Sequence, residues 1–303
     1  MSLFEDSGVQ PGAVAVDSPY QAPFDGSLAL VDLPTRAPRT GVGNRAKLRK
    51  VRDQLGNVQE ALYAGRQYSV LCIFQALDAA GKDGTIREVF QGLDPSGVKV
   101  ASFKRPSARE LAHDFLWRTS RELPGRGRIG VFNRSYYEEV LVVRVHPEFL
   151  AAQYPMGSPE PEGLWPMRYR AIREHERHLA AASTVILKFW LNVSPEEQAR
   201  RFLDRIEESD KRWKFSARDV YEAGHRAEYD AAALDMLNET SRPWAPWFVI
   251  PADDKPFMRL QVARIVLHAL QALPLEYPRP DVADSAEMDG IADRLRDQLK
   301  SGN

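Results

Sequence analysis

Cysteine is almost absent from this sequence of 303 residues, in which Cys72 stands alone. A single thiol cannot build a disulfide framework or a cysteine redox pair. Long apolar runs are also missing, because an uncharged stretch such as 67–77 falls far short of the roughly 20 apolar residues that a membrane helix needs. The amino terminus lacks a secretion-signal pattern. We therefore expect a cytoplasmic protein that has no membrane partner.

The chain has no excess of one charge, since its net charge at pH 7 is −1. A near-neutral total argues against general coating of nucleic acid, so we expect no nucleic-acid partner. The charges are nevertheless segregated: residues 36–52 contain seven basic and no acidic residues, and residues 99–134 are also biased toward basic ones. Local basic fields favour an anionic ligand. The run 36–52 fits a solvated helix face equally well.

The most informative segment is residues 76–85, ALDAAGKDGT. It follows an apolar run, 68–75, and precedes a helix-like segment that begins near Lys82. A strand, a glycine-bearing turn, a lysine and a helix together form a phosphate cradle, because the first amides of the helix point into the turn. This order predicts a protein that handles phosphoryl groups.

The loop departs from the pattern GxxxxGK[ST] at two positions, where Ala76 replaces the first glycine and Asp83 replaces the metal-binding hydroxyl. A further carboxylate, Asp78, lies inside the loop and would repel phosphates unless a cation lay between them. That arrangement favours a metal ion held by the loop. The alternative is an ordinary tight turn that needs Gly81 and Gly84 for backbone reasons only.

Apolar runs alternate with helical patterns along the chain, which predicts a parallel α/β sheet with helices on both faces. We expect strands at 68–75, 98–103, 128–132, 184–191 and 245–250, and later helices at 107–122, 136–145, 167–182, 195–207 and 257–273. The proline-rich segment 150–167 reads as irregular. We divide the chain into an irregular arm (1–45), a catalytic domain (46–275) and a tail (276–303).

Ligands of parallel sheets bind beyond the carboxyl ends of the strands. Residues with suitable chemistry follow four predicted strands: Asp78–Thr85, the pair Lys104 and Arg105, the group Asn133, Arg134 and Tyr136, and the group Asp253, Asp254 and Lys255. We expect them to meet at one edge. A long polyanion is expected to touch several basic residues of this region, namely Lys104, Arg105, Arg121, Arg126 and Arg128.

Residues 198–219 alternate cations and anions around few apolar residues, which is unfavourable for a core helix. The pattern suits a lid, at about 198–226, that excludes water and brings cations to the transferring phosphates. An exposed helix with internal ion pairs explains the same pattern.

Five ordered blocks resemble polyphosphate kinase family 2 over roughly residues 45–272. They are ALDAAGKDGTI, SFKRP, FNRSYYEEVLVVRVHPE, ILKFWLNVSPEEQARRFLDR and KRWKFSARD. The resemblance implies a P-loop kinase-like fold with a helical lid. It also implies reversible phosphoryl transfer between polyphosphate and nucleotides, with Mg²⁺ or Mn²⁺ as the cofactor. The neutral Asn133, followed by SYYEE, resembles the branch that accepts both AMP and ADP.

The motifs and the resemblance together give a set of candidate site residues. Catalytic roles go to Asp78, Lys82, Arg134, Arg201 and Arg205, with Asp78 also the metal ligand. Phosphate contacts go to Ala79, Ala80, Gly81, Lys82, Asp83, Gly84, Thr85, Lys104, Arg105 and Lys211. Nucleotide contacts go to Asn133, Arg134, Tyr136, Glu88 and Asp253.

The leading hypothesis is a polyphosphate kinase that phosphorylates AMP and ADP, with ATP as the product and guanine nucleotides as further substrates to test. We also expect a homo-oligomer. Two alternatives stay open at this point. One is an ATP-dependent nucleotide or nucleoside kinase of similar fold, and the other is a catalytically silent sensor of polyphosphate or nucleotides.

Overall fold

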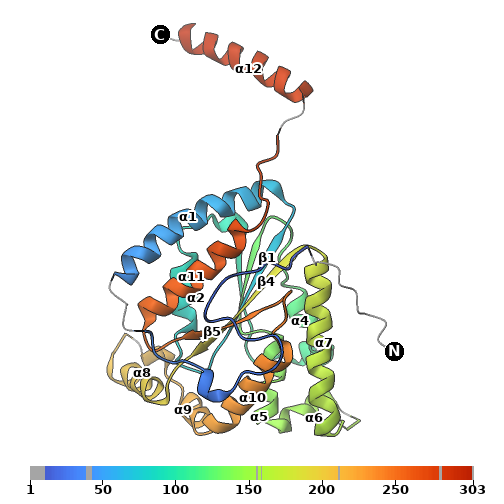
Figure 1. Ribbon diagram of the computed structural model, residues 1–303, viewed down its shortest axis with the longest axis vertical. Helices are drawn as coiled ribbons and strands as arrows, with labels where there is room; N and C mark the ends of the chain where they lie inside the picture. The colour runs from blue at the N-terminus through green and yellow to red at the C-terminus, as the bar shows by residue number, and fades with distance from the viewer. Residues whose placement is uncertain are drawn as a thin grey trace.

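A five-stranded parallel sheet forms the centre of the computed structural model, which describes residues 11–38, 43–154, 156–157, 159–210, 212–279 and 282–301. Its strand order is β2-β3-β1-β4-β5 (Figure 1). The strands are β1 (Ser69–Gln75), β2 (Val98–Ser102), β3 (Ile129–Asn133), β4 (Thr184–Asn192) and β5 (Trp247–Pro251). Every pairing between them is parallel. The predicted sheet is therefore confirmed.

The two central strands are buried along their whole length, which explains their nearly continuous apolar sequences. Helices α1 (Asn44–Gly65), α2 (Lys82–Phe90) and α11 (Lys255–Gln271) cover one face of the sheet (Figure 1). Helices α7 (Pro161–Ala181) and α10 (Arg226–Thr240) cover the other face. Each face has its own cluster of buried apolar side chains. The prediction of helices on both faces is confirmed.

Three predicted segments differ from the structure. The helix expected at 107–122 consists of two single turns, because Asp114 Oδ1 accepts from the amide of Leu116 and interrupts it. The helix expected at 136–145 begins as a 3₁₀ turn. Helix α7 starts at Pro161, inside the segment read as irregular, since a proline is tolerated in the first helical turn.

The remaining elements are short, except for α8 and the last helix. They are η1 (Leu30–Asp32), η2 (Pro95–Gly97), α3 (Ala108–Leu111), α4 (Trp117–Ser120), η3 (Tyr136–Glu139), α5 (Val142–Val145), η4 (Pro147–Phe149), α6 (Leu150–Gln153), α8 (Pro195–Glu207), η5 (Arg212–Lys214), α9 (Ala217–Ala223) and α12 (Val282–Ser301).

The amino-terminal arm lies along the outer edge of β5. Ala22 donates its amide to the carbonyl of Trp247 at 2.8 Å, and Val249 donates to the carbonyl of Tyr20 at 2.7 Å. These bonds satisfy backbone groups that an edge strand would otherwise expose. Residues 11–38 thus lie on the body, while residues 1–10 and 39–42 fall outside the described part.

Helix α12 extends away from the body (Figure 1) and lies in the segment that we expected to be only a tail. Its exposed apolar residues Met288, Ile291, Leu295 and Leu299 recur at helical spacing. Within the described residues, no helix is both long and apolar enough to cross a membrane.

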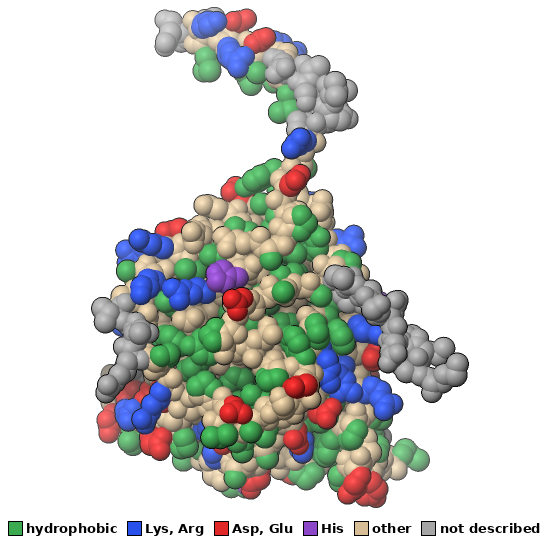
Figure 2. All heavy atoms as spheres, viewed as in Figure 1, with side chains coloured by type: hydrophobic (Ala, Val, Ile, Leu, Met, Phe, Trp, Pro, Cys, Tyr) green, Lys and Arg blue, Asp and Glu red, His purple; other side chains and the backbone are tan. Residues whose placement is uncertain are grey.

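The basic run at 36–52 belongs mostly to α1. Basic side chains gather over this helix in Figure 2. The burial pattern of the chain gives Arg45, Lys47 and Arg49 as exposed. Leu48 and Val51, on the opposite side of the helix, are buried in the core. The described part of the run is therefore a solvated helix face, which agrees with the simpler of the two sequence interpretations.

Candidate active site

The loop between β1 and α2 has the backbone of a phosphate cradle. Ala79 has φ = 62° and Gly81 has φ = 97°, so both adopt the left-handed conformation. Glycine tolerates that conformation freely, whereas alanine is strained in it. Gly81 is the N-cap of α2, and Lys82 is the first residue of the helix. The first amides of α2 consequently point into the loop, as the sequence predicted.

Lys82 is half-buried beside this loop, and its ammonium group makes no hydrogen bond or ion pair to any described residue. Burial and the nearby guanidinium of Arg134 lower the pKa of Lys82 to about 8, although Glu138 and Asp78 oppose the shift. An arriving phosphate would favour the charged ammonium. Lys82 is thus available for an anionic ligand.

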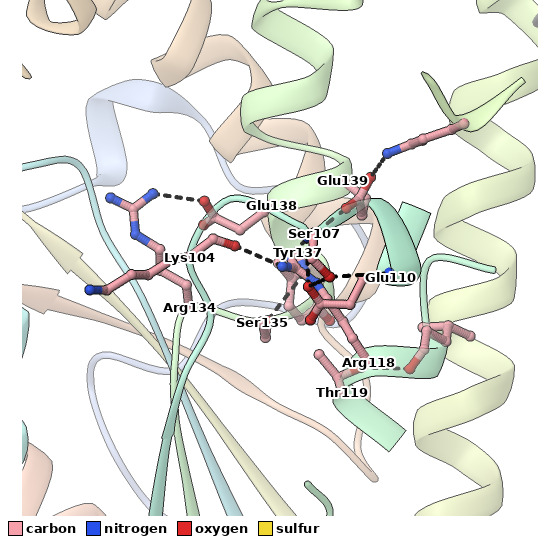
Figure 3. Close-up of polar contacts among 12 residues, drawn as sticks. Lys104, Ser107, Glu110, Arg118, Thr119, Arg134, Ser135, Tyr137, Glu138 and Glu139 are labelled. Carbon is pink, nitrogen blue, oxygen red and sulfur yellow. Dashed lines mark hydrogen bonds and ion pairs between the residues drawn. The ribbon is translucent and has the colours of Figure 1, made fainter. Parts of the chain in front are cut away.

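Arg134 links the loop to the end of β3. Its Nη2 donates to Asp78 Oδ1 at 2.7 Å, and its Nη1 donates to Glu138 Oε2 at 2.7 Å. Figure 3 shows the guanidinium of Arg134 directed at Glu138. The Glu138 carboxylate raises the pKa of Arg134, mainly by charge attraction that outweighs burial. Burial works to raise the pKa of Glu138, but Arg134 and Lys82 outweigh it and lower that pKa.

The backbone of Arg134 is also fixed, which explains how one side chain reaches both acids. Its φ is 64°, in the left-handed region, and its amide donates to the carbonyl of Phe74 at 3.0 Å. Gln75, the last residue of β1, donates its Nε2 to Glu138 Oε1 at 2.9 Å. The ends of β1 and β3 therefore form one preorganised unit.

A buried polar network supports the segment that follows Arg134. Lys188 and Glu176 are both fully buried, and their Nζ and Oε2 lie 2.7 Å apart. Lys188 also donates to Tyr137 Oη at 2.8 Å and to the carbonyl of Thr240 at 2.7 Å. Burial lowers the pKa of Lys188 to about 8, against the attraction of Glu176. The network ties η3 to β4, α7 and α10.

Asn133 faces the loop from β3, because its Nδ2 donates to Asp83 Oδ1 at 2.7 Å. The predicted meeting of this residue with the loop is confirmed. Among the described residues, no group of three or more histidine, cysteine or acidic side chains could hold a metal ion. Mg²⁺ needs few protein ligands, because it keeps several waters and is bound by one or two carboxylates plus substrate phosphates. Asp78, with Asp83 nearby, fits that requirement.

Lys104 and Arg105 follow β2, next to the end of β3. The two strands pair Ser102 with Asn133, and the side chains of Lys104 and Arg134 extend in the same direction in Figure 3. Lys104 and Arg105 are exposed. Arg118 holds this turn by donating its Nη1 to the carbonyl of Lys104 at 2.7 Å. The adjacent strand end thus adds exposed positive charge beside Arg134.

Arg126 and Arg128 lie at the other end of the sheet, which corrects the expectation that they join a basic channel at the loop. They precede β3, and Gly127 donates its amide to the carbonyl of Tyr68, just before β1. In a parallel sheet the starts of the strands share the edge opposite the loop. These two arginines cannot contact a short anion in the cradle.

Arg201, on α8, uses its donor groups within the protein, which disagrees with its assignment to the transferring phosphates. Its Nη1 donates to the carbonyl of Ala80 at 2.7 Å, and its Nη2 donates to that of Ala252 at 2.6 Å. Its Nε donates to Glu197 at 2.9 Å. The side chain is only 5% exposed. Arg201 therefore holds the strained loop in place and has no donor group left for a phosphate.

Arg205 keeps a position consistent with a lid cation. It is partly exposed, and its Nη1 donates to Asp219 Oδ2 of α9 at 3.0 Å. Burial and the charge of Asp78 raise the pKa of Asp219, which places this acid near the loop. Basic and acidic side chains gather over the lid at the lower left of Figure 2. The third predicted lid cation, Lys211, lies outside the described residues.

Two predicted ligand contacts have side chains that lie in the core. Tyr136 is fully buried, and its hydroxyl donates to Glu176 Oε1 at 2.9 Å. Thr85 is also fully buried, and its hydroxyl donates to the carbonyl of Gly81 at 3.0 Å. Neither side chain can meet a nucleotide or phosphate, although the amide end of α2 can.

Two predicted nucleotide contacts pair with other groups of the protein. Glu88 is near the end of α2, where its carboxylate is 3.8 Å from Arg52 of α1 and from Arg259 of α11. Asp253 follows β5, and its Oδ1 accepts from the amide of Ser194 at 2.8 Å. Both acids have partners within the protein, and their assignment to the nucleotide stays a prediction.

A pocket lies between the loop, the second motif and the lid. Asp78, Arg134 and Glu138 line one side, and Asp219 and Glu222 of α9 line the lid side. Sequence reasoning missed further lining residues, namely Leu141, Val142, Trp190, Gln198, Ala223, Arg226 and Tyr229. Leu141, Val142, Trp190 and Gln198 lie inside the blocks quoted above, as does the lining residue Asp219, but nothing in those blocks marks them as pocket residues.

The fold and the site define a P-loop kinase-like protein: a parallel sheet, a lysine-bearing loop at a helix start, and helices that cover the pocket. The family model for polyphosphate kinase 2 (PPK2) matches residues 42–277. An ADP-polyphosphate phosphotransferase from Rhodopseudomonas palustris is 50% identical over 242 residues, covering 80% of this chain and 84% of the relative. An AMP/ADP-polyphosphate phosphotransferase from Meiothermus ruber is 44% identical over 230 residues, covering 76% and 82%.

Solved structures agree with the sequence relatives. The crystal structure of Polyphosphate Kinase 2 from Arthrobacter aurescens TC1 superposes with a TM-score of 0.80 at 34% identity, covering 88% of this chain and 93% of that one. The chain therefore belongs to the polyphosphate kinase 2 family.

Proposed function

We propose that this enzyme transfers the terminal phosphoryl group of inorganic polyphosphate to AMP and to ADP, and that the reaction is reversible. The observation that carries the proposal is the unpaired ammonium of Lys82 at the start of α2, beside Arg134. The names of the relatives from Rhodopseudomonas palustris and Meiothermus ruber support polyphosphate as the donor and ADP or AMP as the acceptor.

The residues act mainly by positioning and by charge. Phosphoryl transfer demands little covalent chemistry of the protein, so the main tasks are to align donor and acceptor and to stabilise the charge that spreads over the transferred group. Amides at the start of α2 and Lys82 hold the phosphates. Arg134, already fixed by Asp78 and Glu138, places a cation beside them. Helices α8 and α9 cover the pocket and exclude water.

We propose Mg²⁺ or Mn²⁺ as the cofactor, with Asp78 as its protein ligand. The metal would neutralise part of the phosphate charge. Asp78 would then hold both the metal and Arg134, whose Nη2 lies 2.7 Å from its Oδ1. Asp83, hydrogen-bonded to Asn133, places a second carboxylate at the rim. Asn133 itself adds no charge, which distinguishes this rim from one with an acid at that position.

The exposed Lys104 and Arg105 favour a long anionic donor, because they extend positive charge beyond the cradle. A cytoplasmic location is part of the proposal, since the buried thiol of Cys72 suits a reducing compartment. Homo-oligomerisation and use of guanine nucleotides stay predictions.

The proposal is tested by supplying AMP with either polyphosphate or ATP as the donor, in the presence of Mg²⁺, and by separating the products. We expect AMP to be converted to ADP and then to ATP when polyphosphate is the donor. When ATP is the only donor, we expect little phosphorylation of AMP. Transfer that needs ATP and ignores polyphosphate would identify an ordinary nucleotide kinase instead.

A further inference from the structure

The block FNRSYYEEVLVVRVHPE ends in a histidine that the proposed chemistry does not use. His146 lies between α5 and η4 and is 8% exposed. Its Nε2 is 2.7 Å from Glu222 Oε2, on helix α9 of the lid. The two residues are 76 positions apart in the chain, and their contact connects the body of the protein to its lid.

Glu222 is the point at which several groups converge on the lid. Its Oε2 also accepts from Tyr229 Oη at 2.9 Å, and its Oε1 accepts from Arg218 Nε at 3.3 Å. Burial acts to raise the pKa of Glu222, but the hydrogen bonds from His146 and Tyr229 outweigh it and lower that pKa. Glu222 is therefore held as a carboxylate, which strengthens the bond to His146.

Carboxylates face both ring nitrogens of His146. Its Nδ1 is 3.2 Å from Glu148 Oε1, and its Nε2 faces Glu222. The rings of His225 and Tyr229 lie 5.4 Å and 6.4 Å from the His146 ring. Two acids and one histidine thus form a hydrogen-bonded connection, accompanied by aromatic contacts.

This connection lies at the pocket, because its partner Glu222 lines it. Leu141 and Val142, shortly before His146, line the body side, and Glu222 and Ala223 line the lid side. Asp219 of α9 pairs with Arg205, which belongs to α8 in the same lid segment. Arg218 of α9 lies 6.0 Å from the ring centroid of Phe149 in η4. The hydrogen bonds from His146 and Tyr229 to Glu222 join α9 to the body.

We propose that His146 is a positioning residue that holds lid helix α9 over the pocket through its bond to Glu222. Loss of the bond opens the lid in the free enzyme, which weakens acceptor binding because only the closed form binds well. A saturating acceptor closes the lid again. Truncation of His146 therefore raises KM for the acceptor far more than it lowers kcat. The effect on KM rests on the proposed function, whereas the effect on the lid does not.

Lid opening can be measured without activity, by the initial rate of trypsin cleavage after the exposed Arg212 in the free protein. Because His146→Ala removes the hydrogen bond to the Glu222 carboxylate, it is expected to speed this cleavage about tenfold or more. His146→Gln retains a side-chain amide that can donate to Glu222, and it is expected to restore much of the protection. His268→Ala, at an exposed site on α11, is the matched control.

The same variants are then assayed with polyphosphate and AMP. We expect KM for AMP to rise about tenfold in His146→Ala, with kcat within about twofold of the parent, and His146→Gln to lie between them. Unchanged cleavage in a folded His146→Ala protein would overturn the proposal, as would His146→Gln behaving like the alanine variant in both assays. If His146→Ala is cleaved faster but the parent protein never uses polyphosphate, the proposal about the lid contact stands and only the proposed function is refuted.

Discussion

Arg134 and Asp78 are joined by a hydrogen bond of 2.7 Å between Nη2 and Oδ1. The bond unites two motifs that are 56 residues apart in the chain. It also gives Asp78 two tasks in the proposed reaction, since its carboxylate aligns the guanidinium and offers oxygen to a metal ion. A neutral isostere at this position would lose both the negative charge and part of the alignment.

The first prediction concerns Asp78→Asn. Loss of one preorganised charged contact costs on the order of 10²-fold or more in kcat, so we expect most turnover to disappear while the fold stays intact. Asp53→Asn, on the exposed face of α1, is the matched control and should leave kcat unchanged. Near-normal turnover of Asp78→Asn with native circular dichroism would falsify the assignment.

The second prediction uses the pKa of Lys82, which burial and Arg134 lower to about 8. Below that pH the free enzyme carries an ammonium that attracts phosphate, and above it the amine is neutral. We therefore expect kcat/KM for polyphosphate to decline as the pH rises through about 8. In Lys82→Arg the guanidinium stays charged over this range, so the same decline should be absent even though the rate is lower. If kcat/KM declined in the same way with rising pH in both proteins, the decline would belong to a group other than Lys82.

The third prediction separates two lid arginines that look alike in the sequence. Arg201→Ala removes the donors of the Ala80 and Ala252 carbonyls, and each unsatisfied buried group costs about 1–3 kcal/mol. We expect a clear loss of stability in urea unfolding. Arg205→Ala, at a partly exposed site, should keep its stability and lower kcat more than it raises KM. Equal stability losses would contradict the distinction.

The fourth prediction concerns the salt dependence of donor binding. Each neutralised charge on a polyanion releases counterions, so KM for polyphosphate should rise more steeply with salt than KM for ADP. Removing Lys104 and Arg105 together should flatten the polyphosphate slope. Arg126 and Arg128, at the opposite edge of the sheet, provide the control pair. We would measure KM for polyphosphate and for ADP at fixed free Mg²⁺. If removal of Arg126 and Arg128 flattened the polyphosphate slope as much as removal of Lys104 and Arg105, there would be no local basic channel at the loop.

The sequence allowed the strands, the cradle and the meeting of Asn133 with the loop to be predicted, because each depends on local pattern and on a parallel sheet that brings strand ends together. The role of Arg201 was not predictable. Its partners are backbone carbonyls from two distant loops, and a charged residue in a lid carries no sign of them.

The core position of Tyr136 escaped prediction for a related reason. Its hydroxyl is satisfied by Glu176 of α7, a tertiary partner with no local signal. The turns at 107–122 depend in turn on where Asp114 directs its side chain. At 107–122 a side-chain hydrogen bond interrupts the helix that the periodicity predicted.

The most direct test of the account is to follow phosphorus by ³¹P NMR in one tube that contains the purified protein, polyphosphate, ADP and Mg²⁺. The account predicts that the terminal signal of polyphosphate falls as the γ-phosphate signal of ATP grows, in equal amounts, and that neither change occurs with Asp78→Asn. Hydrolysis of polyphosphate to free phosphate, or no change in a folded parent protein, would contradict it.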